Sequence, residues 1–127
     1  MNVVLYENGT HDAGKKLENM IRELIPNDCF ETFLTIGNLA LKLRKPMNRI
    51  SIALFLATTR DELQELIKLG DLLDSVQVIL VLPDRNTDTV ALGTQIKTSY
   101  ISDMDGNLSD VASVLKQILK NQRSNNH

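Results

Sequence analysis

The sequence has no tryptophan, few aromatic residues and a single cysteine. Aromatic residues make up 4% of the 127 residues, so a core must be built from Leu, Ile and Val. Cys29 has no second cysteine with which to form an intrachain disulfide or a thiolate metal pair, which is typical of a reducing compartment. The two histidines, His11 and His127, stand near opposite ends of the chain and do not form a spaced ligand pair.

The chain also lacks a strong charge excess and a long apolar run. Its formal net charge is −2 at pH 7, and a chain without a basic excess is not expected to bind nucleic acid. A small basic cluster, Lys42, Arg44, Lys45 and Arg49, has no aromatic residue between its members and is interpreted as a solvated helix end. No segment approaches the ~20 apolar residues of a membrane span, and no signal-peptide pattern opens the chain. We therefore expect a cytoplasmic protein with no membrane contact.

Apolar runs and amphipathic segments alternate along the chain. Residues 49–57 are almost continuously apolar, as in a strand covered on both faces, whereas residues 11–25 repeat their apolar positions at the helical period. Thr58 or Thr59 can cap the helix that follows residue 57. The expected strands cover 2–6, 29–35, 49–57, 76–82 and 98–102. The expected helices cover 11–25, 36–45, a segment from the Thr58 or Thr59 cap to about 73, 88–95 and 108–120.

This alternation predicts one α/β domain with a parallel sheet and helical crossovers. The two most apolar strands, the third and fourth, belong in the middle of the sheet. With the first strand also inside, the expected fold is a flavodoxin-like three-layer sandwich with strand order 2-1-3-4-5 and five helices. We expect the domain to span residues 1–120 and residues 121–127 to form a polar tail.

Between Asn2 and Lys120 the chain resembles a bacterial response-regulator receiver domain. The resemblance rests on element order and on the stretches "ALKLRKPMNRISIALFLA", "DELQELIKL", "VILVLPD" and "TSYIS". The family places two Mg²⁺-binding acids after the first strand and a phosphoacceptor aspartate after the third. It places Ser or Thr after the fourth strand and Lys after the fifth. These groups hold the cation and surround the developing charge of phosphoryl transfer.

This chain departs from the receiver pattern at those positions. Glu7 is a lone acid after the first strand, and the third strand ends in Leu56 and Ala57. Leu82 and Pro83 end the fourth strand, while Ser102 and Asp103 stand where the family has lysine. The resemblance therefore implies a degenerate, pseudo-receiver type. We expect no catalytic residues, no metal, no cofactor and no enzymatic activity.

The expected function is signalling through a protein partner or a homodimer. In receivers, the face formed by the fourth helix, fifth strand and fifth helix commonly makes such contacts. Val90, Leu92, Tyr100 and Ile101 fall on or next to the fourth helix and fifth strand, so they are the candidate interface residues. For Val90 and Leu92, packing in the core is at least as good an interpretation.

The alternative function is binding of a small molecule by the carboxyl-end loops. The segment from His11 to Lys15, "HDAGK", is similar to the cobalt-ligating segment of cobalamin-binding domains, although Gly9 stands where that family has aspartate. The segment is more simply interpreted as a turn followed by the start of a helix. The stretch "DMDGNLSD" suggests a calcium loop, but a frame set on Gly106 puts Ile101 and Ala112 at its ends.

Three acids follow strands and should share the carboxyl edge of the sheet. Glu7, Asp84 and Asp103 follow the first, fourth and fifth strands. Acids at that edge can bind a cation or perform acid–base work. Because a nucleophile, a histidine or a basic partner is not expected near them, they are interpreted as solvated loop residues.

Overall fold

The structure is a computed structural model that describes residues 2–9, 12–45, 49–104 and 108–124. Five parallel strands form one sheet in the order β2-β1-β3-β4-β5, which confirms the predicted flavodoxin-like α/β layout. The strands are β1 (Asn2–Tyr6), β2 (Phe30–Phe33), β3 (Ile50–Leu56), β4 (Gln77–Leu82) and β5 (Tyr100–Asp103). The helices are α1 (Asp12–Leu24), α2 (Ile36–Arg44), α3 (Arg60–Ile67), α4 (Thr87–Gly93) and α5 (Ser109–Ser124).

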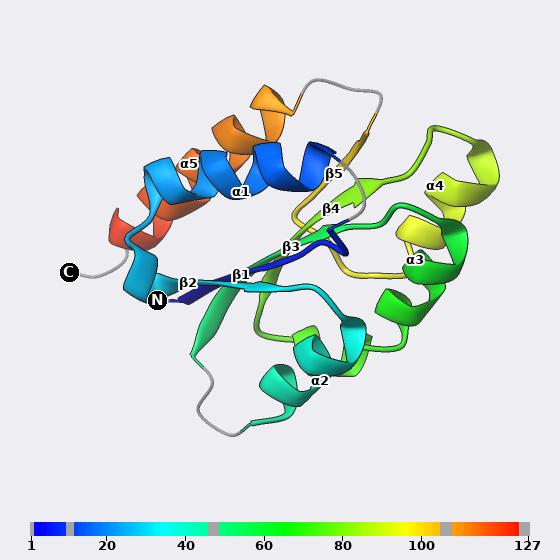
Figure 1. The fold of residues 1–127 in the computed structure, drawn as a ribbon, viewed down its shortest axis with the longest axis horizontal. Helices are drawn as coiled ribbons and strands as arrows, with labels where there is room; N and C mark the ends of the chain where they lie inside the picture. The colour runs from blue at the N-terminus through cyan, green and yellow to red at the C-terminus, as the bar shows by residue number, and fades with distance from the viewer. Residues whose placement is uncertain (1, 10–11, 46–48, 105–107, 125–127) are drawn as a thin grey trace.

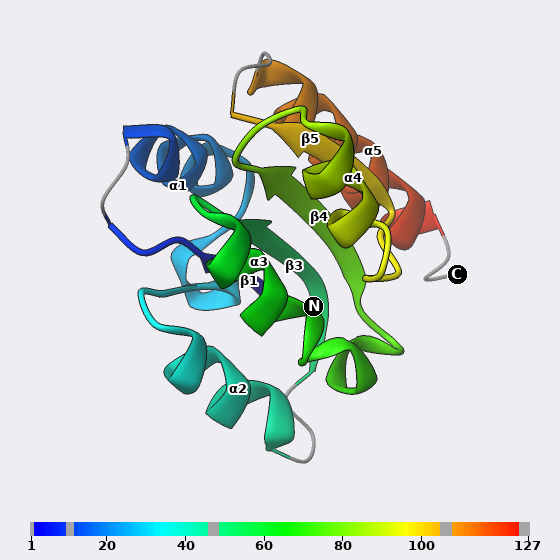
Figure 2. The ribbon, with the colours of Figure 1, turned by 90° about the vertical axis from the view of Figure 1, so that its right-hand side faces the viewer.

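The helices cover both faces of the sheet. Figure 1 shows α1 and α5 together on one face and α2, α3 and α4 on the other, and the turned view in Figure 2 shows the same three layers. The core is accordingly divided in two by the sheet. Val4, Ala53 and Leu80 pack towards α2, α3 and α4, whereas Leu5 and Leu54 pack towards α1 and α5.

The central strands are β3 and β4, as their apolar sequences predict. Leu54 of β3 pairs with Leu5 of β1 on one side and with Ile79 of β4 on the other. None of these three side chains has exposed surface. A strand paired on both edges and covered on both faces has no solvated position, which explains why these segments do not alternate with polar residues.

Helix ends show where the expected boundaries hold and where they shift. Thr59, one of the two predicted caps, is the N-cap of α3, and its hydroxyl oxygen accepts a 3.1 Å hydrogen bond from Glu62 N. The helix ends at Ile67 and gives way to a 3-10 turn at Gly70–Leu73, earlier than the expected end near 73, because glycine is a weak helix former. At the other end of the chain α5 continues to Ser124, so the helix extends into the segment expected to be a tail.

Candidate functional site

Ligands of open α/β folds bind at the carboxyl ends of the strands. Here β1 leads into Glu7, β3 into Ala57 and β4 into Pro83, while β5 ends in Asp103. Ala57 has no exposed surface, and its N–H donates to Val81 O at 3.0 Å. The first residue after β3 therefore carries a buried methyl group and no polar atom on its side chain.

Glu7 is buried against the start of α1, with 5% of its surface exposed. Its Oε2 accepts a 2.9 Å hydrogen bond from the N–H of Gly9, which adopts a φ of 79° in the turn after β1. A Cβ at Gly14, in the first turn of α1, would lie 2.8 Å from the Glu7 carboxyl carbon and closer still to Oε2. The helix covers the carboxylate only because position 14 is glycine. The interpretation of Glu7 as a solvated loop acid is therefore wrong.

Glu62, in the first turn of α3, joins the loops that follow β1 and β3. Its Oε1 accepts from the N–H of Thr58 at 3.1 Å, and its Oε2 accepts from Asn8 Nδ2 at 2.8 Å. The Thr58 hydroxyl lies 3.4 Å from Oε2, and Asn8 Nδ2 also donates to Thr58 Oγ1 at 3.0 Å. The Tyr6 hydroxyl is hydrogen-bonded to the same carboxylate. One side chain thus connects two loops that are some fifty residues apart in sequence.

Tyr6, the last residue of β1, adds a further hydrogen bond to the Glu62 carboxylate. Burial, the negative charge of Glu62, the hydrogen bond to Glu62 and the charge of Glu7 together raise the pKa of Tyr6 to about 12. The phenol therefore stays protonated at neutral pH and donates a hydrogen bond to the Glu62 carboxylate. It is a fixed hydrogen-bond donor rather than a nucleophile or base.

A second bridge joins the loops after β3 and β4. Arg60 Nε donates to Thr89 Oγ1 at 2.9 Å, and Thr89 of α4 has no exposed surface. The hydrogen bond from the Thr89 hydroxyl lowers the pKa of Asp84, with further contributions from the N–H of Asn86 and the charge of Arg60. The arginine and the aspartate share one buried hydroxyl, so the bridge holds α4 against α3.

The end of β5 carries an ion pair between Asp103 and Arg85. Arg85 Nε lies 2.7 Å from Asp103 Oδ2, and the arginine side chain is largely exposed. The other oxygen of Asp103, Oδ1, is buried and has no hydrogen-bond partner among the described residues. Asp103 is thus a partly buried acid with a cationic partner, not a free solvated one.

Parts of the two alternative ligand motifs lie outside the residues that the structure describes. His11 lies outside the described residues, so the cobalamin-type site stays a prediction. Residues 105–107 of the candidate calcium loop also lie outside them, while Ile101 and Ala112 occupy β5 and α5. Across the part of the chain that the structure describes, no group of three His, Cys, Asp or Glu side chains could hold a metal ion. In the same part, no helix is long and apolar enough to cross a membrane.

The predicted interface residues lie on the β5 side of the sheet. Val90 of α4 is 39% exposed. Leu92 and Ile101 are half-buried and pack against the core beneath α2, α3 and α4, whereas half-buried Tyr100 packs against the opposite core. Of these four residues, Val90 alone is exposed; the other three are divided between the two faces of the sheet.

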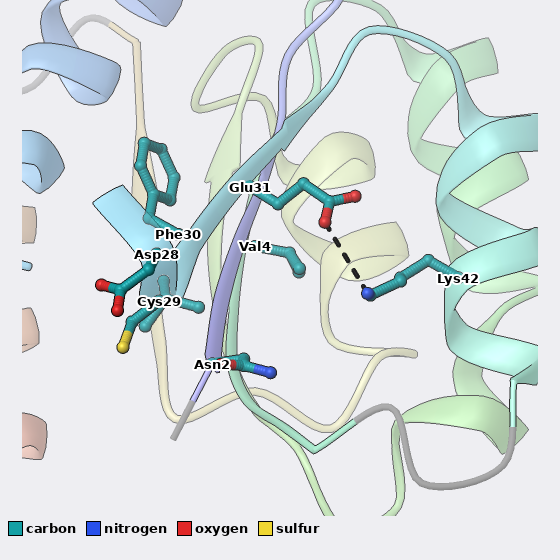
Figure 3. Close-up of a pocket in the computed structure, with 8 residues that line it drawn as sticks. Asn2, Val4, Asp28, Cys29, Phe30, Glu31 and Lys42 are labelled. Carbon is teal, nitrogen blue, oxygen red and sulfur yellow. Dashed lines mark ion pairs between the residues drawn. The ribbon is translucent and has the colours of Figure 1, made fainter. Parts of the chain in front are cut away.

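A pocket that the sequence did not indicate lies at the amino end of β1 and β2. It has a volume of about 130 Å³, and Figure 3 shows its lining side chains. Lys42 of α2 forms a 3.7 Å ion pair with Glu31 on one side, and the half-buried thiol of Cys29 comes from the segment before β2. The sequence carries no spacing signal for this pocket, because β1 meets β2 and α2 there only through the tertiary fold. Its lining residues are Asn2, Val3, Val4, Asp28, Cys29, Phe30, Glu31 and Lys42.

Comparisons with known proteins do not identify a relative. No family model, no curated protein and no solved structure matches the chain. The resemblance to receiver domains accordingly stays a prediction drawn from the sequence.

Proposed function

We propose that the protein is a non-catalytic, receiver-like signalling module that acts through its surface. The observation that carries the proposal is the buried methyl group of Ala57 at the end of β3. Phosphoryl transfer to a receiver needs a carboxylate at that position, and an alanine side chain has no atom that can accept the group.

The side chains around Ala57 further support a role without phosphoryl transfer. The Glu7 carboxylate is bound to Gly9 N–H under α1, and that of Glu62 is bound to Thr58 and Asn8. A Mg²⁺ ion prefers several carboxylate and water oxygens in octahedral geometry. The acids of this edge instead accept hydrogen bonds from the protein itself.

Incubation with Mg²⁺ and acetyl phosphate tests the proposal. We expect no stable covalent phosphoryl adduct in the intact-protein mass spectrum, under conditions that label a receiver domain with the complete set of acids. A hydroxylamine-sensitive mass increase of one phosphoryl group would refute it. Peptide mapping of the adduct would then locate the acceptor among the acids of the sheet edge.

The proposed interaction surface is the face formed by α4, β5 and α5. Val90 supports this choice, because it is a large apolar side chain exposed on α4. The proposed occupant is a second copy of the chain or a partner protein. The part-buried Arg60–Thr89 hydrogen bond supports a rigid α4, which suits a surface that must present one fixed shape.

Paired surface variants test this assignment. Val90→Arg should lower self-association in sedimentation velocity, because it places a charge on the proposed contact. Leu41→Arg is the control: Leu41 is 61% exposed on α2, which lies beside β2 at the other edge of the sheet (Figure 1). A wild-type chain that stays monomeric at high concentration, or equal effects of the two variants, would contradict the homodimer.

A further inference from the structure

The hydrogen-bond donors around the Glu62 carboxylate come from segments outside α3, the helix that carries Glu62. They are the N–H and hydroxyl of Thr58, the Nδ2 of Asn8 and the hydroxyl of Tyr6. Two come from the loop after β3, one from the loop after β1 and one from the end of β1. We name this donor set the Glu62 cradle.

We infer that the Glu62 cradle is an oxyanion-binding site and that the Glu62 carboxylate occupies it as an internal ligand. Its groups present N–H or O–H donors towards one negatively charged acceptor, at 2.8 Å for Asn8 and 3.1 Å for the Thr58 amide. Hydrogen bonds to an ionised acceptor are the strong ones. The same donors suit the carboxylate of a small organic acid or a phosphate group.

The internal ligand can leave without dismantling the cradle. Glu62 is half-buried, and the N-cap of α3 depends on its backbone N–H and the Thr59 hydroxyl, not on its carboxylate. Tyr6, on the other side, is held in β1 within the sheet. An external anion therefore competes with one tethered side chain, whose effective concentration is high. Binding of that anion swings Glu62 away and releases the contact between the first turn of α3 and Asn8.

Removal of the internal ligand tests the inference. In Glu62→Ala, acetate should produce saturable shifts of the Thr58 backbone amide and the Asn8 side-chain amide in ¹H–¹⁵N spectra, at ionic strength held constant with NaCl. The melting temperature of the variant should rise by about 3 °C at acetate concentrations well above its dissociation constant. Phosphate replaces acetate in a parallel titration, and the stronger response identifies the preferred oxyanion.

Glu65→Ala is the matched control, because Glu65 lies on the same helix and its carboxylate pairs with exposed Lys68 at 3.1 Å rather than with the Glu62 cradle. The control and the wild-type chain should show saturable shifts of the two amides only at much higher anion concentrations, because the anion must first displace the tethered Glu62 carboxylate. Glu62→Ser replaces the alanine variant if that variant does not fold. Equal responses of the Glu62 and Glu65 variants to both anions would overturn the inference. The acetyl phosphate experiment uses the wild-type chain, so its outcome is separate from this one.

Discussion

Gly14→Ala should destabilise the fold, although alanine is the better helix former. The substitution adds one methyl group to the first turn of α1. That methyl would stand 2.8 Å from the carboxyl carbon of Glu7 and 3.1 Å from its Cβ. The carboxylate must then move, and its hydrogen bond from Gly9 N–H, 2.9 Å long, is lost or distorted.

The expected magnitude combines three contributions. Overpacking a buried site costs about 1–3 kcal/mol, and a buried polar group left without its partner costs about 1–3 kcal/mol. Replacing glycine by alanine in a helix returns about 1 kcal/mol. Since partial relaxation of the Glu7 side chain relieves some of the overpacking, we expect a net loss of about 2 kcal/mol in the free energy of unfolding.

Urea unfolding followed by circular dichroism measures this loss against a control on another helix. Gly37 of α2 has no atom within 4 Å of the position of an added Cβ, so Gly37→Ala should stabilise the protein by about 0.5–1 kcal/mol. In a Glu7→Ala background most of the cost of Gly14→Ala should disappear. A stabilising Gly14→Ala, or a cost that persists in full without the Glu7 carboxylate, would refute the reasoning.

Three further predictions concern the sheet edge. Thr89→Val keeps the shape of the side chain but removes the hydroxyl that Arg60 contacts, so it should cost about 1–3 kcal/mol in urea unfolding; exposed Thr87→Val should change stability by less than about 0.5 kcal/mol. In the folded state the pKa of Asp84 lies below its ordinary value of 3.8. The ionised carboxylate therefore stabilises the fold above pH 3.8, and this stabilisation is lost as the pH falls through the folded-state pKa. The difference in the free energy of unfolding between the wild type and Asp84→Asn should accordingly shrink between about pH 5 and 2. The pKa of Tyr6 is raised from 10.0 to about 12. The stability that the protonated phenol contributes is therefore present below pH 10 and is lost as the pH rises through about 12. An ultraviolet titration of the native protein should show a tyrosine ionisation near pH 12, and the Tyr6→Phe variant should lack it.

The order of strands and helices could be predicted from the sequence, because the spacing of apolar residues differs between the helical segments and the strand segments. The continuous apolar runs of β3 and β4 can be satisfied only in the middle of a sheet covered on both faces. Helix ends were less well predicted. The run of apolar residues after Thr59 continues to Leu73, yet α3 ends at Ile67 and a 3-10 turn carries the rest.

The sequence shows which functional groups the candidate site lacks, but it does not show which of the side chains present contact one another. The lack of an aspartate at the end of β3 is visible in Ala57 itself, because the strand and its end follow from local hydrophobicity. The burial of Glu7 has a faint local signal, a glycine at position 14 in the first turn of α1. The Glu62 cradle has none, since Asn8 and Thr58 are 50 residues apart.

The sequence by itself determined the layers and the strand order, because hydrophobic periodicity is a local property that each segment expresses independently. Tertiary structure alone decided which polar groups of the sheet edge face one another. Glu62 meets Asn8 and Tyr6, and Arg60 meets Thr89, because parallel pairing brings the ends of β1, β3 and β4 to one edge. A hydrogen bond depends on distance and angle to a fraction of an ångström, and those depend on how the whole sheet and its helices pack.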